Sequence, residues 1–248
     1  MGRKGRVRLR KLRDELMRAC PSISDPEAAI ARGEVVVDGR VVSNADSLVR
    51  EGSAITLRTD EPLRGETKLR AALAAFDVPV RDRVALDVGA AAGGFTRVLL
   101  DVGARRVYAV DAGHGQLVGS LRQDRRVINL ERTNLGHLNT ELVPDTIELV
   151  TLDLSYLALS DAVAQLGRVR LADDAHALAL VKPQFELGLP ASPRERRQLL
   201  GALDKARDGF LARGWDVRGW TESPVRGRRG SREFLLHATR RPNRIAGE

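Results

Sequence analysis

The chain has 248 residues, of which 41 are Lys or Arg and 33 are Asp or Glu, and 43% of the residues are hydrophobic. This composition predicts a soluble, folded protein with one large domain and one small one. The single cysteine, Cys20, excludes a disulfide framework and a cysteine-rich zinc site, and it is typical of a reducing cytoplasm. Since no stretch approaches the about 18 apolar residues that span a bilayer, and no apolar segment follows the basic start, we expect a cytoplasmic protein.

The net charge of +8 is distributed unevenly along the chain. Residues 1–60 carry 12 basic and 9 acidic residues, residues 61–193 carry 15 and 17, and residues 194–248 carry 14 and 7. Two basic flanks around a slightly acidic middle indicate that the protein binds a polyanion. An ordinary solvated charged surface is the alternative that charge alone leaves open.

The first 58 residues predict a small α+β domain. Leucines at helical spacing predict a basic helix over 8–21, and a second helix begins near Ser24 and Pro26. Strands at 35–37 and 41–42 flank a tight turn, and residues 54–57 supply a third strand. A core of this size is too small for most enzymes, so a binding role is expected.

This order, with the stretch ARGEVVVDGRVV after the helix pair, resembles the RNA-binding domain named after the S-four protein of the small ribosomal subunit. In such domains the helices present basic side chains to RNA phosphates. The resemblance, which covers residues 8–58, implies RNA contacts from Arg8, Arg10, Arg13, Arg18 and Arg32. The alternative is a structural cap on the following domain.

A polar segment at 59–67 is expected to be a linker, and a second domain is expected over 68–242, followed by a tail at 243–248. After a helix at 68–76, strands are predicted at 84–88, 106–110, 127–130, 149–152 and 177–181, with a helix beginning near Gly93. This alternation is typical of a Rossmann-like α/β domain with a mostly parallel sheet. Later strands at 215–221 and 233–236, joined by a short connection, predict that the last strand is antiparallel.

The segment VALDVGAAAGGFT places small residues directly after a buried strand, where the backbone can approach a ligand. Its spacing is neither the dinucleotide fingerprint nor a Walker loop. Asp111 follows about 20 residues later at the end of the next strand, where a carboxylate can accept both hydroxyls of a ribose. Together they predict half of an adenosine site, while a tight turn and a surface aspartate are the alternative.

The segments LDVGAAAGGFTRVLLDVGARRVYAVDAGHGQL, LERTN, LDLSYLAL and VKPQFELG resemble the TlyA or hemolysin A-like family, within the FtsJ-type ribose methyltransferases. The resemblance extends over nearly the whole chain and implies a class I methyltransferase domain with S-adenosyl-L-methionine as cofactor. It implies a cofactor site made of Asp87, Gly89, Gly93, Phe95, Asp111, Thr133, Asn134 and Asp153. The family usually has Ser-Thr where this chain has Ala91 and Ala92, so two hydroxyls are missing.

Methylation of a ribose 2′-hydroxyl needs a group that weakens the O–H bond and holds the oxygen in line with the methyl group. A lysine can do so when burial and nearby cations lower its pKa and carboxylates fix its position. The resemblance implies the set Lys68, Asp153, Lys182 and Glu233, with Lys182 polarising the hydroxyl or accepting its proton and the others orienting it. Each residue alone also has an ordinary structural explanation.

After Gly188 the chain lacks the glycine-rich stretch usual in the family and continues as LPASPRERRQLL. Arginines here and in the loop PVRGRRGSRE are candidate phosphate contacts, namely Arg226, Arg228 and Arg229 together with the group at 194–197. The four histidines share no metal-ligand spacing, so no metal is expected.

The leading hypothesis is an S-adenosylmethionine-dependent 2′-O-methyltransferase that modifies cytidine in structured RNA, above all ribosomal RNA or a ribosomal subunit, and acts as a monomer. The alternative is an RNA-binding ribosome-maturation factor with an inactive methyltransferase fold, because the cofactor loop and the segment after Gly188 depart from the family. A pore-forming hemolysin is disfavoured because no segment of membrane length exists.

Overall fold

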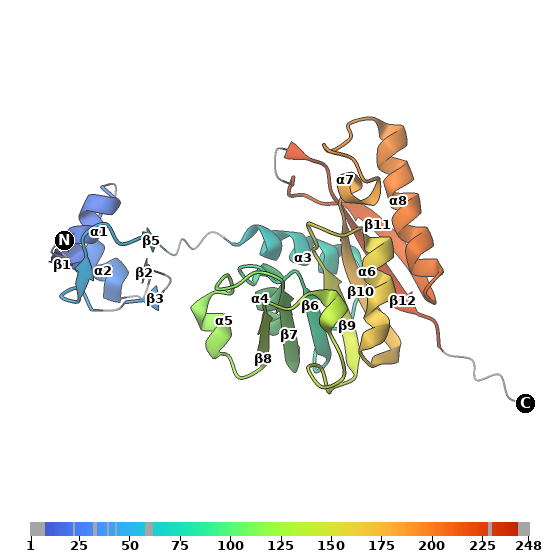
Figure 1. The fold of residues 1–248 in the computed structure, drawn as a ribbon, viewed down its shortest axis with the longest axis horizontal. Helices are drawn as coiled ribbons and strands as arrows, with labels where there is room; N and C mark the ends of the chain where they lie inside the picture. The colour runs from blue at the N-terminus through green and yellow to red at the C-terminus, as the bar shows by residue number, and fades with distance from the viewer. Residues whose placement is uncertain are drawn as a thin grey trace, which may run out of the picture. The chain divides into compact units, whose positions relative to one another are not determined.

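The computed structural model describes residues 8–21, 23–31, 34–38, 40–42, 44–57, 62–227 and 230–242. The chain divides into two compact units, Met1–Glu61 and Pro62–Glu248, shown in Figure 1. The tail expected at 243–248 lies outside the described residues.

The first unit contains two helices and two small sheets. Its elements are β1 (Leu9–Lys11), α1 (Leu12–Ala19), α2 (Pro26–Ala31), β2 (Val35–Val37), β3 (Arg40–Val41), β4 (Leu48–Arg50) and β5 (Ile55–Leu57). Strand β1 pairs with β4, and β2 lies between β3 and β5, all antiparallel. Buried Leu12, Leu16, Ile30 and Val35 form the centre of a core that joins both helices to the sheet.

The first helix begins later than the sequence pattern predicts. Leu9–Lys11 forms a strand rather than the first turn of the helix, because these residues pair with Leu48–Arg50. The sequence also gave no sign of β4, which is only three residues long. The helical spacing of the leucines therefore extends from α1 back into β1. The start of the helix is set by the pairing of β1 with β4.

Helix α3 (Arg64–Ala75) begins inside the segment expected to be a linker. The Glu66 side chain accepts a hydrogen bond from the Leu63 backbone N–H at 3.2 Å and closes the first turn. The start of α3 also packs tightly on α4 (Gly94–Asp101), since a Cβ added to Gly94 would lie 2.9 Å from the Gly65 Cα. The polar composition of 64–67 thus belongs to a capped helix start that is held against a second helix.

The second unit contains a seven-stranded sheet in the order β11-β12-β10-β9-β6-β7-β8. The strands are β6 (Val84–Val88), β7 (Arg106–Asp111), β8 (Val127–Glu131), β9 (Ile147–Leu152), β10 (Leu171–Val181), β11 (Trp215–Glu222) and β12 (Phe234–Arg240). Strands β6 to β10 are mutually parallel, while β12 is antiparallel to both of its neighbours. The prediction of a mostly parallel Rossmann-like sheet with an antiparallel last strand is confirmed.

Helices cover both faces of this sheet (Figure 1). Alternate strand residues such as Leu86 and Ala85 enter opposite cores, as the period of a strand requires. One core includes α6 (Leu159–Gln165) and α8 (Arg196–Leu211), and the other includes α3, α4 and α5 (Gly119–Gln123). The remaining helical elements are α7 (Pro183–Glu186) and 3-10 turns at Leu135–His137 and Leu166–Arg168.

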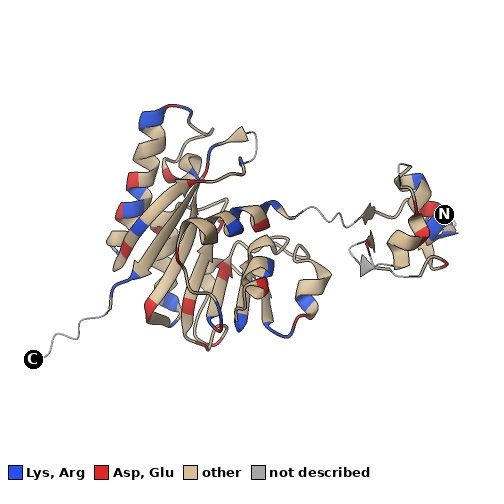
Figure 2. Cartoon of the chain, turned by 180° about the vertical axis from the view of Figure 1, so that it is seen from behind, with Lys and Arg blue, Asp and Glu red and all other residues tan. Residues whose placement is uncertain are grey.

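Charged residues lie mainly on the helices and near the strand ends, and the middle of the sheet carries few of them (Figure 2). Within the sheet, charged side chains are therefore concentrated at the ends of the strands. Within the described ranges, no helix is both long enough and apolar enough to cross a membrane.

Candidate active site

A cavity of about 800 Å³ lies at the edge of the second unit where the parallel strands end. Its walls come from the start of α3, the ends of β6, β7, β9 and β10, and the loop that leads into β12. The predicted site residues that line it are Lys68, Gly89, Asp111, Thr133, Asp153, Lys182 and Glu233. The fold thus brings all four predicted catalytic residues to one cavity.

These four residues form a connected ionic cluster. The Lys182 Nζ lies 2.6 Å from Asp153 Oδ1, and the Lys68 Nζ lies 2.8 Å from Glu233 Oε2 and 3.6 Å from Asp153 Oδ2. The side chains of Lys68, Glu233 and Lys182 are only 9%, 6% and 12% exposed. Two ammonium groups facing two carboxylates at this depth fix one another's positions, because water competes only weakly for them.

Each member of the cluster comes from a different part of the fold. Asp153 directly follows β9, and Lys182 directly follows β10 and precedes α7. Val181 pairs with Phe234 in the antiparallel register, so Lys182 and Glu233 leave the sheet side by side. Lys68 reaches the cluster from α3. An antiparallel last strand is therefore what brings Glu233 to the edge where the parallel strands end.

Several polar residues of the cavity were not predicted from the sequence. Ser155 is the most informative of them, because its Oγ accepts a hydrogen bond from the Lys182 Nζ at 2.8 Å. Tyr156, Gln116, Gln184 and Arg232 also line the cavity. Ser155, Tyr156 and Gln184 follow strand ends by three or four residues, so their positions were a usable signal.

The loop after β6 approaches its surroundings very closely. Gly89 has φ +87°, and a Cβ there would lie 2.4 Å from the Asp153 carbonyl oxygen, so only glycine fits. The Asp111 carboxylate accepts hydrogen bonds from the Ala91 N–H at 2.9 Å and the Gly113 N–H at 2.6 Å. These bonds fix the Asp111 carboxylate at the cavity wall and leave lone pairs for further donors.

Four residues that the resemblance assigned to the cofactor do not line the cavity: Asp87, Gly93, Phe95 and Asn134. Asp87 is fully buried and accepts hydrogen bonds from Thr96 at 2.6 Å and Thr151 at 2.8 Å. Burial raises the pKa of its carboxyl to about 6. Asp87 therefore joins three elements beneath the loop and shapes the cavity from behind.

The other three belong to the packing and turns around the cavity. Gly93 has φ +95°, and a Cβ there would lie 2.2 Å from Leu121 Cδ1. Phe95 is buried in the core shared by α3, α4 and α5. The Asn134 carbonyl accepts the His137 N–H at 2.9 Å and so begins the 3-10 turn that carries the cavity residue Leu135.

Glu131, at the end of β8, organises the loop beside Asp111. Burial opposes its ionisation, but hydrogen bonds from backbone N–H groups, including those of Leu117 and Gln116, lower the pKa of its carboxyl to about 2. The Arg122 guanidinium contacts both Glu131 oxygens at 2.6 and 2.7 Å. Gln116 lines the cavity, so Glu131 holds part of the cavity wall in place. Glu131 was not among the site residues predicted from the sequence.

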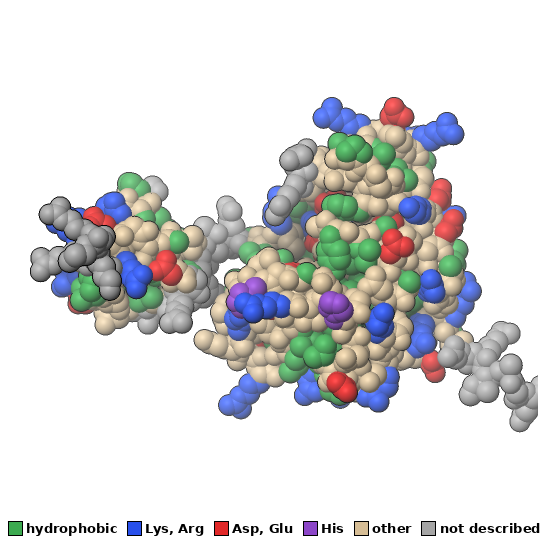
Figure 3. All heavy atoms as spheres, viewed as in Figure 1, with side chains coloured by type: hydrophobic (Ala, Val, Ile, Leu, Met, Phe, Trp, Pro, Cys, Tyr) green, Lys and Arg blue, Asp and Glu red, His purple; other side chains and the backbone are tan. Residues whose placement is uncertain are grey.

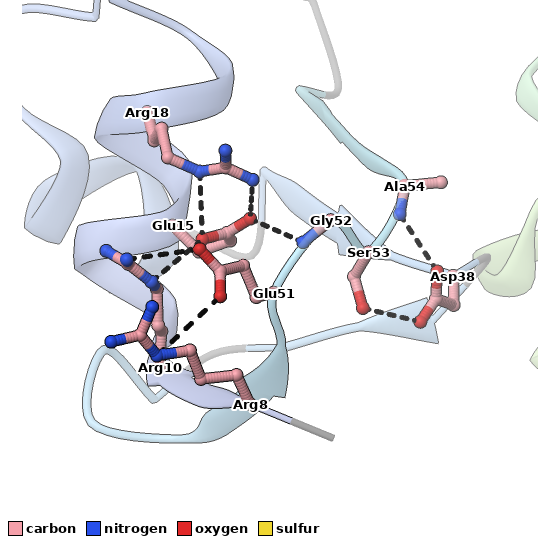
Figure 4. Close-up of polar contacts among 9 residues, drawn as sticks. All are labelled: Arg8, Arg10, Glu15, Arg18, Asp38, Glu51, Gly52, Ser53 and Ala54. Carbon is pink, nitrogen blue, oxygen red and sulfur yellow. Dashed lines mark hydrogen bonds and ion pairs between the residues drawn. The ribbon is translucent and has the colours of Figure 1, made fainter. Parts of the chain in front are cut away.

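In the first unit, the described arginines predicted to bind RNA are paired with carboxylates (Figure 4). Arg18 contacts Glu15 at 2.6 Å, and Arg10 contacts Glu51 at 3.1 Å. Arg8 lies 4.0 Å from Glu51, and Arg13, outside that view, lies 3.1 Å from Glu27. The Glu15 carboxylate also accepts the Gly52 N–H at 2.8 Å, which joins α1 to the turn after β4.

The other arginines predicted to contact RNA lie at the start of α8, in the loop before β12 or in the first unit. Arg226 lies 3.4 Å from Glu222, and its carbonyl oxygen accepts a hydrogen bond from Arg64. Arg228, Arg229 and Arg32 lie outside the described residues. Among the residues that are described, no cluster of three or more His, Cys, Asp or Glu side chains could hold a metal ion.

Comparison with known proteins identifies the family of this chain. The FtsJ-like methyltransferase family matches residues 63–240. The 16S/23S rRNA (cytidine-2′-O)-methyltransferase TlyA of Mycobacterium tuberculosis is 37% identical, over 95% of this chain and 90% of the relative. Hemolysin A of Brachyspira hyodysenteriae is 32% identical, over 87% and 93%. A solved structure from Streptococcus thermophilus, assigned as a hemolysin, has a TM-score of 0.69 at 30% identity and covers 94% of this chain and 89% of that one. This chain therefore belongs to the FtsJ-like methyltransferase family, among the TlyA or hemolysin A proteins.

Proposed function

We propose that this protein transfers a methyl group from S-adenosyl-L-methionine to the 2′-hydroxyl of a cytidine in ribosomal RNA. The observation that carries the proposal is the ionic cluster of Lys68, Asp153, Lys182 and Glu233 on the wall of one cavity. The name of the M. tuberculosis relative, at 37% identity, supports the same substrate class.

The cavity suits the cofactor in size and in chemistry. Its volume of about 800 Å³ lies within the range of small-molecule sites. The Asp111 carboxylate can accept the two ribose hydroxyls of the cofactor, and Thr133 lines the wall nearby. The backbone at Gly89 admits a ligand at close range because no side chain is present there. When bound, the cofactor supplies a methyl group on a positively charged sulfur.

Lys182 is assigned to the hydroxyl that receives the methyl group. An ammonium group has three N–H donors, and Asp153 and Ser155 engage two of those on Lys182. The third position on Nζ is left for the ribose hydroxyl. Nζ passes one proton to Asp153, 2.6 Å away, and rotation about the Cε–Nζ bond turns the lone pair so formed toward the ribose hydroxyl. That lone pair accepts the hydroxyl proton as the oxygen forms its new bond to carbon.

Lys68 and Glu233 keep this arrangement in place. Their ion pair of 2.8 Å holds the Lys68 ammonium within 3.6 Å of Asp153 and opposite Lys182. Asp153 is thereby flanked by two cations, which fix its rotamer. Both residues are thus positioning groups for the reaction.

The first unit is proposed to be an S-four-like RNA-binding domain over residues 1–58, joined to the methyltransferase domain. Arg8, Arg10, Arg13 and Arg18 are its proposed phosphate contacts. The Arg10–Glu51 and Arg13–Glu27 pairs are solvent-exposed, and such pairs contribute only about 0–1 kcal/mol, so RNA phosphates can replace these two carboxylates. In the second unit, Arg226, Arg228 and Arg229 are proposed as phosphate contacts. The protein would act as a cytoplasmic monomer on ribosomal RNA or a subunit.

A methyl-transfer assay tests this function. Ribosomal subunits from cells without this protein, and the naked RNA, are incubated with methyl-labelled cofactor, and modified nucleotides are mapped by their resistance to alkaline cleavage. Label on a cytidine 2′-oxygen is the expected result. Cofactor binding with no label in any subunit or RNA would instead favour a ribosome-maturation factor with an inactive methyltransferase fold.

A further inference from the structure

Trp220 is a large aromatic side chain left exposed next to the catalytic edge. It lies on β11, the outermost strand, and 49% of its surface is accessible. Strand β11 runs parallel to β10, since both are antiparallel to β12. The end of β11 therefore lies at the same sheet edge as Lys182, and Trp220 stands two residues before that end.

A chain of contacts joins Trp220 to the cavity wall. Its ring lies 5.6 Å from that of Phe234 at an interplanar angle of 89°, so the two rings meet edge to face and are not stacked in parallel. The Arg232 guanidinium lies 5.8 Å from the centre of the same Phe234 ring. Arg232 also lines the cavity, so one continuous surface runs from the cavity to Trp220.

The charge around Trp220 favours a nucleic acid over an apolar partner. Glu222, near Trp220 on β11, is 2.9 Å from Arg232 and 3.4 Å from Arg226, so two cations share one carboxylate. Residues 215–242 contain seven Arg and three acidic residues. Basic side chains also gather at the end of the unit where α8 begins (Figure 3). An exposed aromatic face among arginines is the arrangement that binds single-stranded nucleic acid, through base stacking and phosphate contacts.

We propose that Trp220 and Arg232 form a platform that binds an unpaired nucleotide next to the one that is methylated, with the base stacked on Trp220. This inference rests on the proposed function, which requires one nucleotide of an RNA chain to enter the cavity. A nucleotide inside the cavity must be joined to neighbours outside it, and the Arg232 surface provides a path along which one neighbour can lie.

Tryptophan fluorescence tests the platform directly, because the chain has only two tryptophans and the other, Trp215, is buried. A single-stranded oligocytidylate of nine nucleotides should quench the emission of the full-length protein. A duplex of the same length should quench it much less, because paired bases are stacked on each other. The variant Trp220→Phe should lose the quenching but still bind the oligonucleotide.

Kinetics on ribosomal subunits provide the second measurement. Trp220→Ala should raise the KM for the subunit about tenfold, which corresponds to about 1.4 kcal/mol of lost stacking, and should leave cofactor affinity unchanged. Trp220→Phe should restore most of the affinity. Leu142→Ala is the matched control, since Leu142 is 39% exposed and lies before β9, at the opposite end of the strands.

Equal KM values for Trp220→Ala and Leu142→Ala, or equal quenching by single-stranded and duplex RNA, would overturn the platform. Failure of the proposed function would look different. No substrate would then be methylated by the wild-type protein, while quenching by single-stranded RNA and its loss in Trp220→Phe could still be measured.

Discussion

The two units use the same kind of ion pair for different purposes. In the first unit, Arg10 pairs with Glu51 at 3.1 Å, and their side chains remain 39% and 30% exposed (Figure 4). In the second unit, Lys68 pairs with Glu233 at 2.8 Å, and both side chains are nearly buried. Distance alone does not distinguish the two pairs, whereas solvent does, because water and salt screen an exposed pair and scarcely reach a buried one.

The difference teaches what each cluster can do. Exposed arginines can exchange an internal carboxylate for an RNA phosphate at little cost, so their pairs are replaceable. Buried lysines and carboxylates cannot exchange partners without leaving an unpaired charge, so their geometry is fixed before the substrate arrives. The experiments below test this contrast, beginning with the largest expected effect.

Lys182→Ala should reduce methyl transfer by about a thousandfold or more, because the group that engages the ribose oxygen is lost. The affinity for the cofactor should change less than about threefold, since Asp111 and the loop at Gly89 are untouched. Calorimetry and single-turnover transfer measure the two quantities. Arg70→Ala, which removes an exposed basic residue of α3 paired with Asp101, should leave transfer unchanged. Full transfer by Lys182→Ala would show that another residue engages the hydroxyl.

Glu233→Gln should lower the free energy of unfolding by about 3 to 5 kcal/mol, since it leaves the buried Lys68 ammonium without its nearest carboxylate. Urea denaturation measures the loss. The double variant Lys68→Met with Glu233→Gln should recover part of it, because no buried charge is then left unpaired. A loss below about 1 kcal/mol would place this pair in the same class as the exposed pairs of the first unit.

Glu186 shows what burial does to a carboxyl, because burial outweighs the opposing effect of the nearby Lys205 ammonium. Glu186 is 1% exposed, and its Oε1 accepts the Leu159 N–H at 2.7 Å, while its Oε2 has no hydrogen-bond partner among the described residues. Burial raises the pKa of Glu186 from 4.5 to about 7. A raised carboxyl pKa means that the folded protein holds its proton longer than the unfolded chain. Stability is therefore lost as pH rises from about 4.5 to 7.

Glu186→Gln should remove this loss, because an amide oxygen can still accept the Leu159 N–H and carries no charge. The variant should be more stable than the wild-type protein by about 3 kcal/mol at pH 8, and the difference should shrink towards pH 4. Asp87 is also buried and its pKa is also raised, but it is present in both proteins, so its contribution to stability cancels in the difference. Thermal or urea unfolding across this pH range measures the effect. A difference independent of pH would exclude titration of Glu186 as its cause.

Much of this architecture could be predicted from the sequence, for physical reasons. The inner strands of the parallel sheet are largely buried on both sides, and they and the edge strand β8 read as short apolar runs, so all five were located. Residues at the ends of such strands meet at one edge, which is why Asp111, Asp153 and Lys182 could be placed together. Glu233 followed from the expected antiparallel last strand.

Other features depend on contacts that no local pattern reveals. The strand at Leu9–Lys11 exists because of Leu48–Arg50, nearly forty residues away. The start of α3 at Arg64 depends on the close approach of Gly65 and Gly94. Asp87 lies directly after apolar residues of β6, like a cofactor ligand, but Thr96 and Thr151 bind its carboxylate beneath the loop. Distinguishing a residue that faces a cavity from one that lies behind it requires the packing.

The smallest expected effect concerns Arg10 and Glu51, which are 3.1 Å apart and partly exposed. Breaking this pair by Glu51→Gln should cost less than about 1 kcal/mol of stability. The same change should strengthen RNA binding about two- to threefold, because it removes a carboxylate that competes with phosphate for Arg10.

Arg10→Ala should instead weaken binding and lower the slope of log affinity against log salt by about 1. Filter binding of ribosomal RNA between 50 and 200 mM salt measures both variants. If Glu51→Gln weakened RNA binding as much as Arg10→Ala, the pair would be a fixed structural unit like Lys68 and Glu233, and the contrast between the two units would fail.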